Sequence, residues 1–288
     1  MISRHLSGLL LVGVAIACTG TRSSVPVPAP APVTPAPEPT LPVPASPGSS
    51  SFKYKAGSLS YQVTRSAVIE RTDSLNQRES TANTTHEVLV LETTDQGIGF
   101  SAVVDTFSTT TQGLIGTAQP TQLPVQQSGL LTSDSLSIYT NAGTDTCNPI
   151  STVLTTDLHN LLITFPAVLS AGVTWADSVN IQGCQSGVQT LSHVSRSYTV
   201  SGEVMFEGKP AVLILRTDTT HARGEGGLEQ HRITINVVGN GTAAYYLSPM
   251  IGQVLGITVN QALDLGVTTT AREYHFRQSS KQEFRLVP

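Results

Sequence analysis

Two histidines are the residues of this sequence whose spacing most favours binding chemistry. His221 and His231 flank the segment Gly224-Glu225-Gly226-Gly227, whose glycines predict a chain reversal. In a hairpin centred on Gly226 the two histidines oppose each other on one face. Neighbouring imidazoles can ligate a metal ion or bind the polar head of a ligand, so we predict a ligand or metal rim here. The alternative interpretation is a solvated hairpin end without a ligand.

The same hairpin register predicts other cross-strand pairs. It places Arg223 opposite Glu229 near the tip and Leu215 opposite Val237 in the body, so that unlike charges and apolar residues meet. It also places both histidines on a face made apolar by Leu213, Leu215, Ile233 and Ile235.

Trp175 is the third member of the predicted rim. It is the only tryptophan and lies in Gly172-Val173-Thr174-Trp175-Ala176-Asp177, a segment that predicts entry into a strand from a turn. Two interpretations remain open: an aromatic side chain that lines a ligand site, or an anchor of the hydrophobic core.

Two of the three cysteines, Cys147 and Cys184, form an even pair in a chain that we expect to be exported. We predict a disulfide between them, which would stabilise the fold by roughly 4 kcal/mol in the chain-entropy model. A metal or redox pair is the alternative, but neither cysteine belongs to a C-x-x-C motif.

Familiar catalytic motifs do not occur in the sequence. There is no G-x-S-x-G elbow or phosphate loop, and His86-Glu87 lacks the second histidine of a zinc-protease helix. We therefore predict no catalytic residues, no resident metal and no cofactor, and expect a protein that is not an enzyme. An enzyme with an unrecognised site is a lesser alternative.

The N-terminal segment reads MISRHLSGLLLVGVAIAC and predicts export. Arg4 precedes an uncharged apolar run that is too short to span a membrane as a helix. Ala15-Ile16-Ala17-Cys18 resembles the lipobox of bacterial lipoproteins, with Ala15 in place of the usual Leu. The resemblance implies a signal peptide over 1–17 and fatty acylation (palmitate) of Cys18. An ordinary secretory signal is the alternative, because Ala-x-Ala also suits the general signal peptidase.

Residues 18–50 form the second predicted region, a disordered proline-rich tether. VPVPAPAPVTPAPEPTLPVPASPG holds most of the seventeen prolines and favours polyproline II, which cannot bury a core. At about 3.1 Å per residue it would act as a stalk on the order of 75 Å long. A docking site for a proline-binding partner is the alternative.

Residues 51–288 are predicted to form one domain rich in strands. Leu59, Tyr61 and Val63 alternate with polar residues, and strands are expected over 88–93 and 98–104. Asn148-Pro149 predicts the start of one amphipathic helix over 149–161. Further turns are expected at Glu207-Gly208-Lys209, Asn240-Gly241, Ser248-Pro249 and Asp264-Leu265-Gly266.

This pattern predicts a mainly β fold. Many strands with one helix cannot build a parallel sheet, so we expect a curved antiparallel sheet, a half-barrel or open barrel, that wraps the helix. The order of tether, strands and enclosed helix is similar to that of half-barrel envelope lipoproteins, including lipoprotein-localisation carriers.

Charge and localisation then limit the function. A formal net charge of −4 with 12% charged residues leaves no basic face for nucleic acid. Thr19-Gly20 lacks the aspartate that retains some lipoproteins at the inner membrane, so the resemblance implies a periplasm-facing outer-membrane location. We predict an envelope lipoprotein, held at the membrane through Cys18, whose curved sheet binds a lipid, another apolar ligand or an envelope partner. A structural or adhesive module without a ligand is the alternative.

Overall fold

One long antiparallel sheet accounts for most of the described chain. The computed structural model describes residues 49–73, 77–112, 123–139, 147–185, 188–227 and 232–288. Cys18 and His231 lie outside these ranges. The strands of the large sheet are β2 (Gly57–Arg71), β3 (Arg78–Thr94), β4 (Gly97–Gln112), β5 (Val125–Leu131), β6 (Leu136–Tyr139), β8 (Thr174–Gln185), β9 (Val188–Phe206), β10 (Lys209–Gly226), β11 (Ile233–Ser248), β12 (Gln253–Thr269) and β13 (Glu273–Val287).

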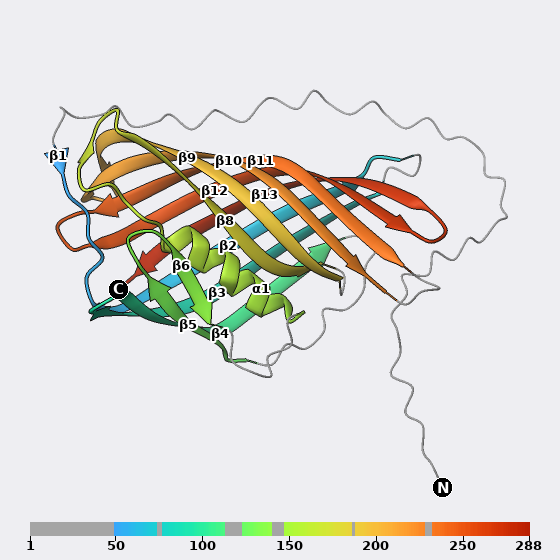
Figure 1. Cartoon of the computed structure of the whole chain (residues 1–288), viewed down its shortest axis with the longest axis horizontal. Coiled ribbons are helices and arrows are strands. Elements are labelled where there is room, and N and C mark those ends of the chain that lie inside the picture. Colours follow the sequence, from blue (N-terminus) through green and yellow to red (C-terminus); the bar gives the residue numbers. More distant parts are fainter. Residues whose placement is uncertain (1–48, 74–76, 113–122, 140–146, 186–187, 228–231) are drawn as a thin grey trace, which may run out of the picture. The chain divides into compact units, whose positions relative to one another are not determined.

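The 11 strands form one curved sheet, and we call the space on its concave side the hollow. The 11 strands run β6-β5-β4-β3-β2-β13-β12-β11-β10-β9-β8, so that the first and last long strands pair and β6 and β8 are the edges. The single described helix, α1 (Pro149–Leu161), follows β6 and precedes β8 in sequence, and contacts β4, β5 and β8 (Figure 1). The predicted curved antiparallel half-barrel with one helix is confirmed.

Both ends of α1 are fixed by specific contacts. The Asn148 side chain accepts hydrogen bonds from the backbone N–H groups of Ile150 (2.9 Å) and Ser151 (3.3 Å), as expected of an N-cap. At the other end, the Tyr54 hydroxyl donates to the Leu161 carbonyl at 2.9 Å. The predicted disulfide is confirmed: Cys147 and Cys184 are bonded, which ties the start of the helix to the end of β8.

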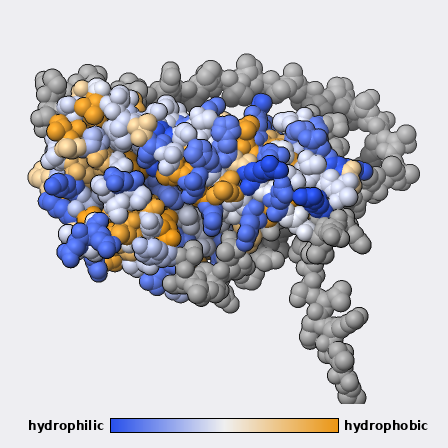
Figure 2. All heavy atoms as spheres, in the orientation of Figure 1, coloured by the Kyte–Doolittle hydropathy of each residue, from blue (hydrophilic) through white to orange (hydrophobic). Residues whose placement is uncertain are grey.

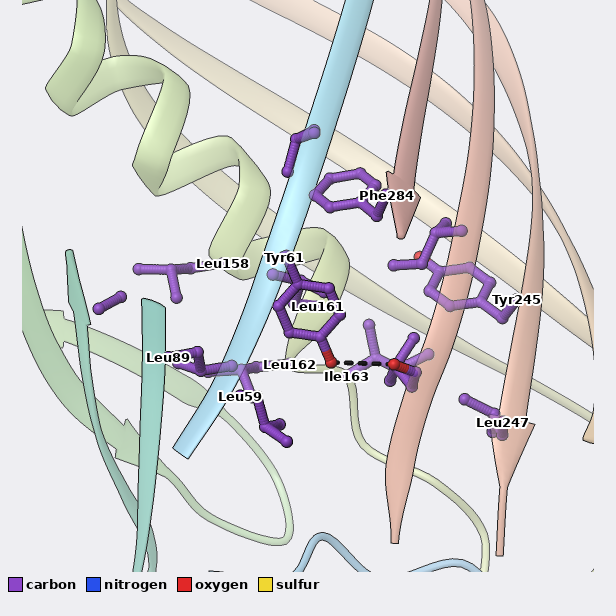
Figure 3. Packing of buried hydrophobic residues seen from close by; sticks show 14 of the residues in the cluster. Leu59, Tyr61, Leu89, Leu158, Leu161, Leu162, Ile163, Tyr245, Leu247 and Phe284 are labelled. Carbon is purple, nitrogen blue, oxygen red and sulfur yellow. Dashed lines mark hydrogen bonds between the residues drawn. The ribbon is translucent and has the colours of Figure 1, made fainter. Parts of the chain in front are cut away.

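The core fills the hollow between α1 and the sheet. Leu59, Tyr61 and Val63 of β2 point inward, as their alternation predicts, and are at most 5% exposed. Figure 3 shows Leu158 and Leu161 of α1 in the same cluster as Leu59 and Tyr61. The Tyr61 hydroxyl donates to the Val254 carbonyl at 2.9 Å, so the only polar atom of this side chain is satisfied.

A small second sheet closes one end of this core. It pairs β1 (Ser49–Ser50) with β7 (Leu169–Ser170). Figure 2 shows a visible surface that is mostly polar, with apolar residues in separate patches. Within the described part of the chain, no helix has both the length and the apolar character required to cross a membrane.

The predicted register of the β10–β11 hairpin is wrong. Gly226 pairs with Ile233, and His221 pairs with Val238 instead of His231. Likewise, Arg223 pairs with Asn236 rather than Glu229, and Leu215 with Ala244 rather than Val237. The physical reason is that β10 continues through the glycines to Gly226, so the chain reverses after them and every partner is displaced along β11.

Two predicted turns are also wrong, at Asn240-Gly241 and Asp264-Leu265-Gly266. Both segments lie inside strands, where Gly241 pairs with Asp218 and Gly266 pairs with His275. At Gly241 the glycine serves packing instead of a turn, because the Asp218 carboxylate occupies the space of a β-carbon.

Gly241→Ala is therefore expected to destabilise the fold by about 1–3 kcal/mol through overpacking. Gly266→Ala is the matched control, since the β-carbon there would lie 4.0 Å from its nearest neighbours, the Asn236 carbonyl and His275 Nδ1. That substitution should be neutral or stabilise by about 0.5 kcal/mol. Urea unfolding of both variants gives the comparison, and equal effects would contradict the packing role assigned to Gly241.

Candidate functional site

The buried face of α1 carries polar residues where a purely apolar stripe would be expected. Asp157, His159 and Asn160 are all less than 10% exposed, and they alternate with the apolar residues that enter the core. A buried polar group is costly unless it is hydrogen-bonded. Each of these positions meets an arginine of the sheet, so three arginines hold the helix in the hollow.

Arg65 of β2 forms the first of these contacts. Its Nη2 donates to Glu87 Oε1 at 3.0 Å and to the carboxyl of Asp157, while Nη1 donates to Thr85 Oγ1 at 2.9 Å. Gln282 of β13 donates its side-chain amide to the same Asp157 carboxyl. Asp157 thereby connects α1 to strands β2 and β13.

Two carboxyl groups share this single guanidinium. Burial raises the pKa of Asp157 well above its usual value, and the neighbouring Glu87 raises it further, while Arg65 acts in the opposite direction. Two carboxylates this close cannot both ionise easily in a dry site. Burial and the neighbouring Glu87 therefore favour the protonated form of Asp157 in the folded protein.

Arg196 of β9 forms the second contact. It donates from Nε and Nη2 to the two oxygens of Asp177, at 2.7 and 2.6 Å, and from Nη1 to the His159 carbonyl at 2.7 Å. This bidentate pair orients the guanidinium toward the helix. Burial, together with the charge of Arg196, lowers the pKa of the His159 side chain to about 4, so that imidazole is neutral near pH 7.

Arg216 of β10 forms the third contact. Nη1 donates to Asn160 Oδ1 at 2.8 Å and to the Tyr245 hydroxyl at 2.6 Å, and Nε donates to Asp218 Oδ2 at 3.1 Å. Arg216 and Asp218 are both buried, at 4% and 5% exposure.

The three contacts are electrically balanced. Arg65 pairs with Glu87, Arg196 with Asp177 and Arg216 with Asp218, while Asp157 and His159 favour their neutral forms. None of these three guanidiniums is therefore left without a carboxylate, and the three pairs offer no net attraction to an anionic ligand.

A small cavity lies beside α1 at the edge of this network. Its volume is about 40 Å³, and it is lined by His159 and Asn160 of the helix and by Val179, Val194 and Val259 of the sheet, among others. That volume holds water but no larger molecule. The buried Nδ1 of His159 has no protein partner, which is consistent with a hydrated cavity.

An apolar part of the hollow lies beyond the helix. Its buried residues are Val188, Ile235, Val237 and Leu265, and its half-buried residues are Ala222, Ile233, Leu263, Val267 and Phe276. These residues form a cluster separate from the main core, and no residue of α1 belongs to it. We call this cluster the inner apolar patch. Its half-buried members retain surface that a ligand can contact.

Trp175 belongs to the core rather than to this patch. Its ring stacks on Tyr198 with centroids 4.8 Å apart and an interplanar angle of 7°, and it packs against the main cluster. Its buried indole Nε1 has no hydrogen-bond partner. The structure therefore places Trp175 as a core anchor at one end of the hollow.

His221 lies away from both the hollow and the inner apolar patch. It is exposed on the outer face of β10, where its neighbours are His193 of β9 and Val238 of β11. Ile235 points to the opposite face, because its partner in the sheet is the inward-facing Gly224. The predicted shared apolar face of His221 and Ile235 is therefore wrong, and Trp175 is not brought near His221.

The sequence prediction missed the arginines that hold the helix. Arg65, Arg196 and Arg216 occupy inward positions in strands whose residues alternate between the two faces of the sheet. On the helix, Asp157 and Asn160 share the face of Leu154 and Leu161. Charged residues at positions that alternation assigns to the interior were the available signal. Their partners, however, come from α1 and from the same or adjacent strands, β3, β8, β10 and β11, and alternation alone does not predict these contacts.

Comparison with known proteins identifies no family for this chain. No protein-family model matches the sequence, and no curated protein matches it.

Asp157→Asn should change how stability depends on pH. Folding raises the pKa of Asp157, so above about pH 4 the folded protein retains a proton that the unfolded chain releases. The free energy of unfolding therefore decreases as pH rises above about 4. Asparagine keeps a similar shape without ionising. We expect urea unfolding between about pH 4 and pH 8 to show a flatter profile for this variant than for the wild type.

Asp95→Asn is the control for this measurement. Asp95 is an exposed carboxylate in the β3–β4 turn. Its replacement should leave the slope of the wild-type profile unchanged. A profile for Asp157→Asn that parallels the wild type would show that Asp157 ionises freely in the folded protein.

Proposed function

We propose that this chain is an exported, membrane-anchored lipoprotein of the cell envelope whose curved sheet binds an apolar ligand. The observation that carries the proposal is the inner apolar patch, which lies on the hollow side of the sheet and outside the core around α1. Apolar residues on a concave surface are typical of ligand sites.

Charge and geometry support an apolar occupant. The arginines of the hollow are each paired with a carboxylate, so they contribute no net attraction for an anion. The sheet is anchored on both sides of the patch by its continuous pairing from β9 to β13, which makes the patch rigid. A rigid apolar surface lowers the entropic cost of binding.

A structural or adhesive module is the second candidate. It is favoured by the way in which α1 fills part of the hollow with its own side chains, such as Leu154 and Leu158. In that case the inner apolar patch would be an extension of the core and would bind nothing.

Ala222→Trp tests ligand binding directly. Ala222 is half-buried on the inner face, and a tryptophan there would fill the space over the patch. We expect at least a tenfold loss of affinity, about 1.4 kcal/mol, for a fluorescent dansyl fatty acid used as the probe. Fluorescence titration gives the affinity, and mass spectrometry of lipid extracts identifies any acyl material bound to the purified wild type.

His221→Trp is the matched control. His221 is the adjacent residue of β10 and faces outward, so the same side chain is added on the other side of the sheet. This variant should bind the probe like the wild type. If neither variant changes binding, the probe does not occupy the patch; if the wild type binds no probe and carries no lipid, the structural module is favoured.

The membrane anchor is tested at Cys18. Metabolic labelling with palmitate should label the wild type and leave Cys18→Ser unlabelled, because the thiol is the proposed acylation site. The variant should also lose its fractionation with the membrane, since a protein without its acyl chains has no other proposed anchor. Labelling that persists in Cys18→Ser would contradict the lipobox assignment.

A further inference from the structure

Three polar residues on the outer face of the sheet form a chain of hydrogen bonds. The Ser60 hydroxyl lies 2.6 Å from His86 Nε2, and His86 Nδ1 lies 2.8 and 2.9 Å from the two carboxylate oxygens of Asp105. Ser60 comes from β2, His86 from β3 and Asp105 from β4. We call this group the outer triad.

The tautomer of His86 follows from its partners. A carboxylate only accepts hydrogen bonds, so Nδ1 carries the proton that is donated to Asp105. In the neutral imidazole Nε2 is then an acceptor, and the Ser60 hydroxyl donates to it. This is the arrangement in which a histidine removes the proton of a serine nucleophile.

The sheet geometry positions these side chains without a loop. Gln62 of β2 pairs with His86, so Ser60 lies diagonally across from His86 on the same face. The β3–β4 register shifts by one residue between His86 and Glu87, which leaves Asp105 between the partners of these two residues. Such bulges redirect side chains and occur next to active sites.

The group is accessible from solvent. The side chains of His86 and Asp105 are 37% and 44% exposed, and Ser60 is half-buried. Gln62 is exposed beside them and supplies an amide donor on the same surface.

A second serine and histidine on the outer face provide an internal comparison. His193 Nδ1 donates to Asn180 Oδ1 at 3.0 Å, but His193 Nε2 lies 3.5 Å from the Ser195 hydroxyl. Here an uncharged amide replaces the carboxylate, and the serine contact is at the limit of a hydrogen bond. A neutral amide stabilises the imidazolium that forms when a histidine accepts a proton less than a carboxylate does, because it carries no charge.

We infer that the outer triad is a nucleophilic site at which Ser60 is acylated by exposed carboxylic esters. Ser60 Oγ forms a bond to the carbonyl carbon of the ester while His86 Nε2 takes the hydroxyl proton and Asp105 stabilises the imidazolium. The bond from that carbon to the alkoxy oxygen breaks, and the alcohol leaves with the proton from His86. Water then attacks the acyl carbon while His86 Nε2 takes a proton from it, the bond from that carbon to Ser60 Oγ breaks, His86 returns the proton to Ser60 Oγ, and the carboxylic acid is released.

The substrate class follows from the surface. The triad lies on the outer face of a sheet, which suits a small, unhindered acyl group better than a long chain that requires a tunnel. The site is on the opposite face from the inner apolar patch, so it is independent of the proposed ligand binding.

p-Nitrophenyl acetate tests the inference on the full chain. Release of p-nitrophenolate measures the rate of acylation, and peptide mapping by mass spectrometry locates the acetyl group. We expect acetylation of Ser60 to be at least about tenfold faster than that of Ser195 in the same wild-type molecules. This comparison requires no variant and does not depend on folding after substitution.

Variants then assign the roles. His86→Ala and Asp105→Asn should each slow the acetylation of Ser60 at least about tenfold. Ser60→Ala should abolish the fast release of p-nitrophenolate, and Ser195→Ala, the matched control, should leave it unchanged. Equal acetylation of the two serines, or acetylation of Ser60 that survives His86→Ala at the wild-type rate, would overturn the inference.

Discussion

The pairing of three inward-facing arginines with one helix is the interaction on which the rest of this structure depends. Arg196 and Arg216 lie on the neighbouring strands β9 and β10, whereas Arg65 lies on β2, which β13, β12 and β11 separate from β10; all three arginines reach α1. Buried ion pairs add little net stability, but removal of one partner typically costs about 3–5 kcal/mol. The pairs therefore act mainly on specificity: they define where the helix sits and how far the sheet must curl to meet it.

This constraint separates the two faces of the sheet chemically. Inward positions carry the core, the paired charges and the inner apolar patch, because the helix and the curl exclude water from them. Outward positions hold isolated polar pairs and the outer triad along part of the sheet, and a separate buried apolar cluster that includes Ala211, Leu213 and Leu255 elsewhere. A one-residue shift at His86/Glu87 is enough to place a carboxylate beside an imidazole on the outer face.

Sequence patterns predicted the elements well and their long-range contacts poorly. The alternation of Leu59, Tyr61 and Val63, the Asn148 cap and the Cys147–Cys184 bridge depend on local chemistry or on elimination among a few cysteines, and they were predicted correctly. The hairpin register failed because glycines were taken as turn signals, whereas Gly224, Gly226 and Gly241 make room for neighbouring atoms inside the sheet. The arginine contacts and the outer triad were missed because their members meet only after the strands are paired.

The comparison of the two outer-face histidines shows why geometry, and not residue type, must identify such a site. His86 and His193 each have a serine and a polar oxygen within reach, so a search by composition would treat them alike. They differ in the charge of the group behind the imidazole and in the contact to the serine, 2.6 Å against 3.5 Å. Both differences make the serine beside His86 the better nucleophile, because a carboxylate stabilises the imidazolium and a short contact allows the serine proton to transfer to the histidine.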